Sequence, residues 1–148
     1  MKKIITLIVL FSMVLVVFAE EFKGFLGIPF GTSKAQCLAI MENKGWTFQS
    51  SMSDYKTQFF TGKKYAGKDI TGILMIFEGN NLNGVCVMLE NSDAVEIFKA
   101  MTKKYGLRKI ENENYYITND YNAIISLSDG TLIIIDPPMD NSTLESDI

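Results

Sequence analysis

The chain has 148 residues, with 14 lysines and arginines against 17 aspartates and glutamates, a formal net charge of −3 and no histidine. This length predicts one domain, and the acidic balance argues against binding to nucleic acid or to anionic membrane surfaces. Without histidine the chain lacks Ser-His and Cys-His catalytic pairs and every histidine-containing metal site.

The first 19 residues have the pattern of a secretory signal peptide. Lys2 and Lys3 precede an apolar run over residues 4–18, and Ala19 stands just before two glutamates. We therefore expect cleavage after Ala19 and an exported protein, periplasmic or secreted. The alternative is an uncleaved anchor, but the run is shorter than the roughly 20 apolar residues that span a bilayer. At the other end, residues 137–148 are expected to form an acidic, flexible tail.

The segment GIPFGTSKAQCLAIMENKG, residues 27–45, predicts the first helix, over residues 34–44. Ser33 and Gln36 form a capping box at its start, and Gly45 stands where a left-handed residue ends a helix. A phosphate-binding loop is the alternative, but the spacing of the glycines and the lysine does not fit one. Pro29 also lacks the backbone N–H that such a loop would donate.

Three short apolar runs follow and predict strands over residues 56–61, 72–78 and 85–90, the last two joined by a turn at residues 78–81. The runs show little alternation of apolar and polar residues, which is typical of strands shielded on both faces. Helices packed on one face of a sheet would leave its other face exposed to solvent. We therefore expect that the sheet curls on itself or that its open face meets something.

A second helix is predicted over residues 94–105, with Asp93 as its cap, Glu96 completing the capping box and Gly106 at its end. Strands are predicted after it over residues 115–118, 122–128 and 131–136. Asp129 and Gly130 separate the last two, and Asp-Gly between two apolar runs is the strongest short-range signal for a hairpin.

The two halves of the chain match at an offset of 60 residues, so that Ser33 corresponds to Asp93 and Met41 to Met101. The sequence therefore predicts a single α+β domain over residues 20–136: a mainly antiparallel sheet with two amphipathic helices on one face. It also predicts two helix-plus-meander pseudo-repeats, over residues 25–90 and 91–136. The alternative is a coincidence, because capping boxes are common.

Two cysteines, Cys37 and Cys86, leave two readings open. In an oxidising compartment they could form a disulfide. Alternatively they are two buried thiols, since free cysteine is among the most buried residue types. A nucleophilic Cys37 is not favoured, because it lies in the apolar arc of the first helix and the chain has no histidine to activate it.

Aromatic residues provide the candidate binding site. They cluster between the first helix and the strand that begins at Gly72, and again in the corresponding part of the second half. Aromatic side chains are enriched at protein interfaces; the alternative is that they pack the core and the rim of the sheet. The candidates are Trp46, Phe48, Tyr55, Phe59, Phe60, Tyr65, Tyr115, Tyr116 and Tyr121.

The stretch FLGIPFGTSKAQCLAIMENKG, residues 25–45, resembles small exported bacterial domains of the β-lactamase-inhibitor-protein-like and outer-membrane-assembly-lipoprotein-like groups. The matching positions are Phe30, Gly31, Thr32 and Gln36, with Cys37 where those groups have a branched apolar residue. The resemblance implies tandem helix-plus-sheet repeats and a non-enzymatic envelope or secreted protein that binds other proteins. The chain departs from the inhibitors in having one clear helix per repeat instead of two short ones, and from the lipoproteins in lacking their acylated cysteine.

These observations favour an exported, non-catalytic protein-interaction module without cofactor or metal, whose partner is an envelope or secreted protein. The alternative is a carrier of a small apolar ligand held between helices and sheet. A hydrolase that uses carboxylates alone is the least supported class. Its candidate pairs, Glu90 with Asp93 and Glu111 with Glu113, lie at the ends of predicted elements, where capping and solvation explain them.

Overall fold

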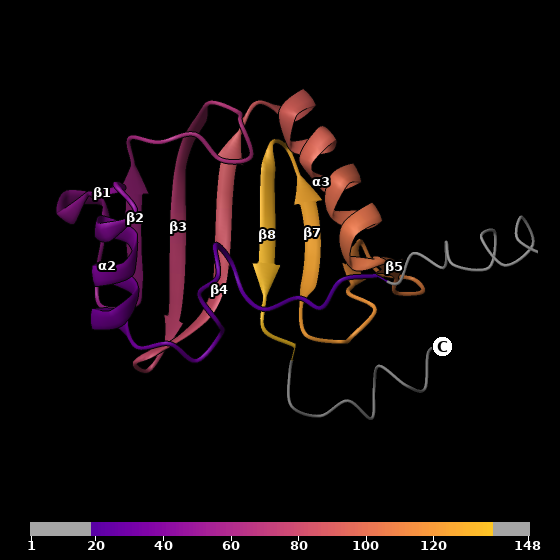
Figure 1. Ribbon diagram of the computed structural model, residues 1–148, viewed down its shortest axis with the longest axis horizontal. Helices are drawn as coiled ribbons and strands as arrows, with labels where there is room; N and C mark the ends of the chain where they lie inside the picture. Colours follow the sequence, from indigo (N-terminus) through magenta and orange to yellow (C-terminus); the bar gives the residue numbers. More distant parts are fainter. Residues whose placement is uncertain (1–18, 138–148) are drawn as a thin grey trace, which may run out of the picture.

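The computed structural model describes residues 19–137, which form two α-helices and an eight-stranded antiparallel sheet (Figure 1). Residues 1–18 of the predicted signal peptide and residues 138–148 of the predicted tail lie outside the described residues. In chain order the elements are α2 (Lys34–Asn43), β1 (Thr47–Phe48), a 3₁₀ turn (Ser50–Met52), β2 (Thr57–Thr61), β3 (Ile70–Glu78), β4 (Asn81–Leu89), α3 (Asn91–Tyr105), β5 (Arg108–Lys109), β6 (Tyr115–Ile117), β7 (Ile124–Ser128) and β8 (Thr131–Ile135).

The first helix begins as the sequence predicts. The Ser33 hydroxyl accepts a hydrogen bond from the backbone N–H of Gln36 at 3.3 Å and donates one to the Gln36 side-chain oxygen at 3.1 Å. This cap satisfies a backbone donor that has no partner within the helix. The helix ends at Asn43, and the backbone at Gly45 then takes a left-handed φ of 90°.

The second helix begins three residues earlier than predicted, at Asn91, so Asp93 lies in its first turn instead of capping it. The cap position belongs to Glu90, whose side chain makes no capping hydrogen bond. The reason is tertiary: the backbone N–H of Leu89 is bonded to the carbonyl of Gly130 at 2.9 Å, so the chain leaves β4 directly into the helix. The predicted end is confirmed, since Gly106 is left-handed at φ 61°.

The sheet has the strand order β1-β2-β3-β4-β8-β7-β6-β5. Each helix is followed by a meander of four strands, and the two meanders join through their last strands, where Val85 pairs with Ile134 and Val87 with Leu132. The β7–β8 turn has the predicted hairpin geometry, with positive φ at Asp129 and Gly130. The outermost strands, β1 and β5, were not predicted, and each is only two residues long.

Both helices pack against the same face of the sheet, as predicted. Cys37 and Met41 of α2 share one buried cluster with Ile97 and Met101 of α3. Most strand residues in that cluster alternate along the chain, as one face of a pleated sheet requires, among them Ile73, Met75, Phe77, Val85, Val87, Leu132 and Ile134. We call this side of the sheet the helix face and the opposite side the open face.

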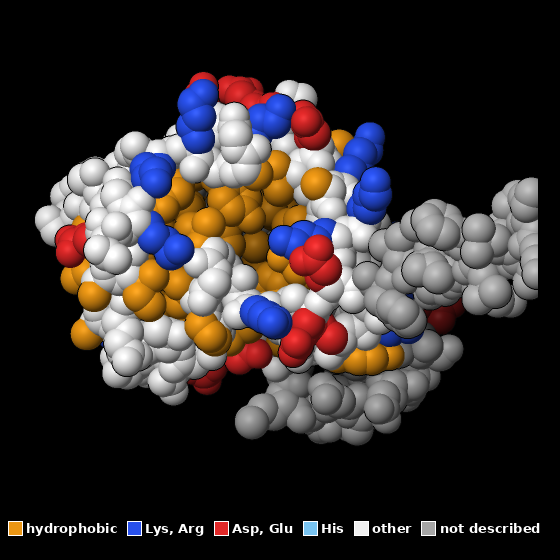
Figure 2. Space-filling view, viewed as in Figure 1, with side chains coloured by type: hydrophobic (Ala, Val, Ile, Leu, Met, Phe, Trp, Pro, Cys, Tyr) orange, Lys and Arg blue, Asp and Glu red, His pale blue; other side chains and the backbone are white. Residues whose placement is uncertain are grey.

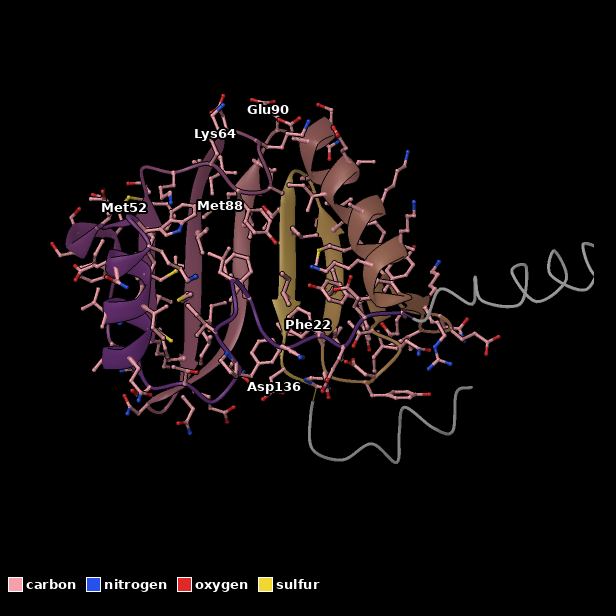
Figure 3. The ribbon with its side chains drawn as sticks, viewed as in Figure 1. Phe22, Met52, Lys64, Met88, Glu90 and Asp136 are labelled. Carbon is pink, nitrogen blue, oxygen red and sulfur yellow. The ribbon has the colours of Figure 1, made fainter. Side chains whose placement is uncertain are left out.

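The N-terminal segment, residues 19–31, crosses the helix face between the two helices (Figure 1). Phe22, Phe25 and Ile28 are buried and belong to the same core cluster. One end is fastened where the Phe22 backbone N–H donates to a carboxylate oxygen of Asp120 at 2.6 Å. The other end is fastened where Gly31 donates to the carbonyl of Leu82 at 2.8 Å. Figure 3 labels Phe22 on this segment, near the end of the sheet at which Asp136 lies.

Candidate functional site

The structure does not bring the predicted aromatic residues together into one surface. Trp46 and Phe60 are buried in the core cluster, and the Phe48 ring packs 5.7 Å from the Phe60 ring, centroid to centroid. Phe59, also buried, lies outside that cluster on the open face. Tyr55, in contrast, is 74% exposed in the loop before β2. Most of the first group therefore packs core and rim, which is the alternative reading of these residues.

The aromatic residues of the second half lie around β6. The half-buried Tyr116 makes an edge-on contact with Phe98 of α3 at 4.9 Å, and Tyr115 is half-buried on the same strand. Tyr121 stacks on the guanidinium of Arg108 at 5.0 Å. Of the nine candidates, Tyr65 and Tyr116 line cavities, and the two cavities are separate.

The two cysteines are free. Cys37 is buried under α2 in the core cluster, whereas Cys86 lies between Val85 and Val87, which both point to the helix face. Because successive side chains of a strand point to opposite faces, the sheet separates the two thiols. The possible disulfide is therefore not formed, and desolvation raises the pKa of Cys37 to about 11 and raises that of Cys86 as well.

The carboxylates that could serve catalysis or metal binding are dispersed or engaged in ion pairs. Asp93 and Glu96 both bind Lys68, at 3.7 Å and 2.8 Å. Within residues 19–137, no group of three or more histidine, cysteine, aspartate or glutamate side chains could hold a metal ion. Over the same residues, no helix has the length and apolar character needed to cross a membrane.

A hollow with a volume of about 400 Å³ opens on the helix face between α3 and the N-terminal segment. Its walls are residues 22–27, the turn at residues 65–68 and one side of α3, and Ile134 of β8 lies at its floor. Figure 2 shows hydrophobic side chains inside this depression and charged side chains around its edge. We call it the helix-face hollow.

Two tight turns of the same kind form one wall of the helix-face hollow. In the first, Phe25 and Ile28 exchange backbone hydrogen bonds of 3.1 and 2.9 Å around Leu26 and Gly27. In the second, the turn at residues 65–68, Tyr65 and Lys68 exchange bonds of 3.0 and 2.9 Å around Ala66 and Gly67. All four central residues have positive φ, between 49° and 77°. The two turns are held side by side by the rings of Phe25 and Tyr65, whose centroids lie 5.2 Å apart.

The opposite wall is α3, which contributes Ile97, Ala100, Met101, Lys104 and Tyr105. These residues recur at intervals of three and four, so they share one side of the helix. The Tyr105 ring meets the Phe22 ring edge-on at 5.4 Å, closing the wall at one end. Ala100 is exposed, and its small side chain leaves the hollow open to solvent at the middle of the helix.

The two ends of the helix-face hollow differ in charge. At one end Lys68 is bonded to Glu96 and lies near Asp93, and the hydrogen bond to Glu96 contributes most to raising its pKa. At the other end Lys104 lies 3.8 Å from Glu20, and the neighbouring Tyr105 side chain contributes most to raising the pKa of Lys104. Burial raises the pKa of Tyr65 to about 12, so its phenol is neutral at physiological pH.

The open face presents a second surface. Six apolar residues are half-buried there: Leu74 and Ile76 of β3, Cys86 and Met88 of β4, and Ile133 and Ile135 of β8. The register sets Leu74, Cys86 and Ile133 directly beside one another. None of the six belongs to or packs against the core cluster, and neither helix of the described chain lies on this side. We call these six residues the open-face patch.

The sequence predicted an apolar open face and, as an alternative, a ligand site between helices and sheet, but it did not identify the residues that form the helix-face hollow. The hollow is assembled from segments about 40 and 70 residues apart, and local pattern does not report such contacts. The sequence does carry a signal for the two turns. Each turn, FLGI and YAGK, has an aromatic residue first and a glycine third, and glycine favours tight turns.

Comparison with known proteins adds no relative. No family model matches the chain, and neither does any curated protein or solved structure. The resemblance of residues 25–45 to small exported bacterial domains therefore stays a prediction, and the function is argued from the two surfaces.

Proposed function

We propose that this protein is an exported, non-catalytic interaction module that binds an envelope or secreted protein through its open-face patch. The observation that carries the proposal is the patch itself: six half-buried apolar side chains on three adjacent strands, without a helix over them in residues 19–137. Large contiguous apolar areas on a protein surface mark sites of interaction.

The chemistry of the patch specifies the kind of partner surface. None of its six residues is charged, so a partner gains most by presenting an apolar surface that buries them. The backbone groups of β3, β4 and β8 already pair with neighbouring strands. Binding therefore depends on the side chains of the open face. A partner strand could pair with little of the sheet edge, because the edge strands β1 and β5 are each two residues long.

The location of the carboxylates supports a non-catalytic role. Glu90 and Asp93 are one of the carboxylate pairs considered for catalysis. Glu90 lies at the cap position of α3, whereas Asp93 forms an ion pair with Lys68. The proposal therefore ranks binding above hydrolysis.

The test is capture of an exported partner by the tagged chain in its native organism, with and without Ile133→Thr. Threonine keeps the β-branched shape that strands favour but makes the β8 side of the patch polar. We expect capture of one specific exported protein to fall by about tenfold or more, as for the loss of an interface hot spot. Thermal unfolding of both chains verifies that the fold is retained.

The matched control is Ala39→Thr, an exposed position on α2, which should capture the partner like the unaltered chain. Phe60 is unsuitable as a probe because its side chain is fully buried. If Ile133→Thr captures the same protein as efficiently as the unaltered chain, the open-face patch is not the interface. If sedimentation instead shows a dimer that Ile133→Thr dissociates, the occupant is a second copy and the proposed heterologous partner is wrong.

A further inference from the structure

The helix-face hollow has the size and lining of a ligand site. Its volume of about 400 Å³ falls within the range of about 300–1,000 Å³ typical of small-molecule cavities. Its interior is apolar, with contributions from Phe22, Phe25, Ile97, Met101 and Ile134. A hydrocarbon chain of up to medium length would replace water along this interior, which is favourable for each methylene buried.

Polar groups are placed at the ends of the hollow rather than within it. Among the described residues, Lys68 has two carboxylates within 3.7 Å, so its charge is already balanced. Lys104 has one, that of Glu20 at 3.8 Å, and its own side chain is 52% exposed. An anionic group can therefore approach Lys104 without displacing a close ion pair, whereas at Lys68 it would meet two negative charges.

The polar groups beside Lys104 also suit an anion. Lys104 lies over the Tyr105 ring at 5.1 Å from its centroid, and Tyr105 itself lines the hollow. At this end of the helix-face hollow, the phenol provides a hydrogen-bond donor and the ammonium provides a counter-charge. The apolar part of the Lys104 side chain can also lie along the helix-face hollow while its ammonium group stays in water.

We propose that the helix-face hollow binds a free single-chain anionic amphiphile, a fatty-acid-like carboxylate, with its hydrocarbon chain on the apolar floor and its head group beside Lys104. This site lies on the opposite side of the sheet from the open-face patch. The inference therefore stands without the protein-interaction proposal.

The test is calorimetric titration of the chain purified in its exported form, free of detergent, with octanoate, decanoate and dodecanoate below their micelle-forming concentrations. We expect affinity to rise by up to about fourfold for each methylene added, from about 0.8 kcal/mol per buried group, and to level off when the hollow is full. Decanol should bind more weakly than decanoate, and decyltrimethylammonium more weakly still.

Two substitutions separate the parts of the site. Lys104→Met removes the charge and keeps the apolar stem, so the affinity for decanoate should fall by about fivefold, the effect of a half-exposed ion pair, while decanol binding is unchanged. Ala100→Phe fills the open middle of the helix-face hollow and should abolish binding of both decanoate and decanol. Ala39→Phe, the same change at an exposed position of α2 away from the hollow, should leave binding intact.

A second measurement keeps the test independent of the Phe variant's folding. Methyl signals of Met101 and Ile134, which line the hollow, should shift on addition of decanoate, while that of the exposed Met52 should not. Equal binding by Ala100→Phe and the unaltered chain, unshifted Met101 and Ile134 signals, or binding to anionic lipid vesicles but not to monomeric decanoate would each overturn the inference. Ile133→Thr, on the open face, should bind decanoate normally, so failure of one proposal is distinguishable from failure of the other.

Discussion

Gly72 lies beneath the ring of Phe59 on the open face. A Cβ atom placed on Gly72 would stand 2.2 Å from the tip of that ring, well inside contact distance. The backbone there does not have the positive φ that favours glycine for conformational reasons. Glycine is therefore required for space, because the aromatic ring takes the room that a side chain would occupy and is itself buried by doing so.

We expect Gly72→Ala to lower the free energy of unfolding by about 1–3 kcal/mol, the usual cost of overpacking a fitted contact. Chemical unfolding in urea measures this directly. The control is Gly84→Ala, whose added Cβ would stand 3.1 Å from the Ile135 Cγ2 methyl and 3.5 Å from the Ile134 carbonyl oxygen, and which should therefore cost less. In a Phe59→Leu background the extra cost at Gly72 should largely disappear; an unchanged cost would show that the ring is not its cause.

The elements were predicted well wherever their ends depend on nearby residues. Ser33 and Gly106 fix helix ends through contacts within one turn, and both predictions are confirmed. The start of α3 was predicted wrongly because a hydrogen bond from Leu89 to Gly130, 41 positions away, sets it. Strands β1 and β5 were missed because two residues carry no recognisable periodicity.

Asp120 joins two elements that are distant in sequence. Its carboxylate accepts hydrogen bonds from the Thr118 hydroxyl at 2.7 Å, the Phe22 backbone at 2.6 Å and the Asn122 backbone at 3.1 Å. Desolvation pulls the pKa of Asp120 upward, but these hydrogen bonds outweigh it and hold the pKa below its ordinary value of 3.8. The ionised carboxylate therefore fastens one end of the N-terminal segment.

This cluster should make the attachment of the N-terminal segment dependent on pH. Because the folded-state pKa is the lower one, the stabilisation is fully present above about pH 5 and is lost as the pH falls through the folded pKa. Asp120→Asn should cost about 1 kcal/mol at pH 7 and progressively less below pH 4. Urea unfolding of both chains across this range measures the difference. A difference that stays constant down to pH 3 would contradict the role of the charge.

At the scale of the whole molecule, the sequence predicted the architecture but not the surfaces. The order helix, meander, helix, meander follows from local signals, and the apolar strand runs correctly indicated that the open face would be apolar. The aromatic site was not assembled because neighbours in sequence are not neighbours in a sheet. Phe59 and Phe60 are consecutive and point to opposite faces. The strand register and the path of the N-terminal segment decide which side chains come into contact, and long-range packing sets both.

The separation of Cys37 and Cys86 by the sheet gives a test of the whole arrangement. In the folded chain, iodoacetamide should modify Cys86, which is half-buried on the open face, several-fold faster than Cys37, which is fully buried. Both reactions should be slow at neutral pH, because only the thiolate reacts and burial raises the pKa of each thiol. Intact mass after timed labelling counts the modified thiols, and peptide mapping identifies them.

In the unfolded chain the two thiols should react at similar rates, which controls for local sequence. An intact mass that increases by two hydrogens on reduction would show a disulfide and contradict the separation of the cysteines by the sheet. Faster labelling of Cys37 would contradict the assignment of the two faces. Because Cys86 lies at the centre of the open-face patch, its labelling should slow in proportion to bound partner, whereas decanoate in the helix-face hollow should leave it unchanged. One thiol thereby reports the occupancy of one side of the sheet and not the other.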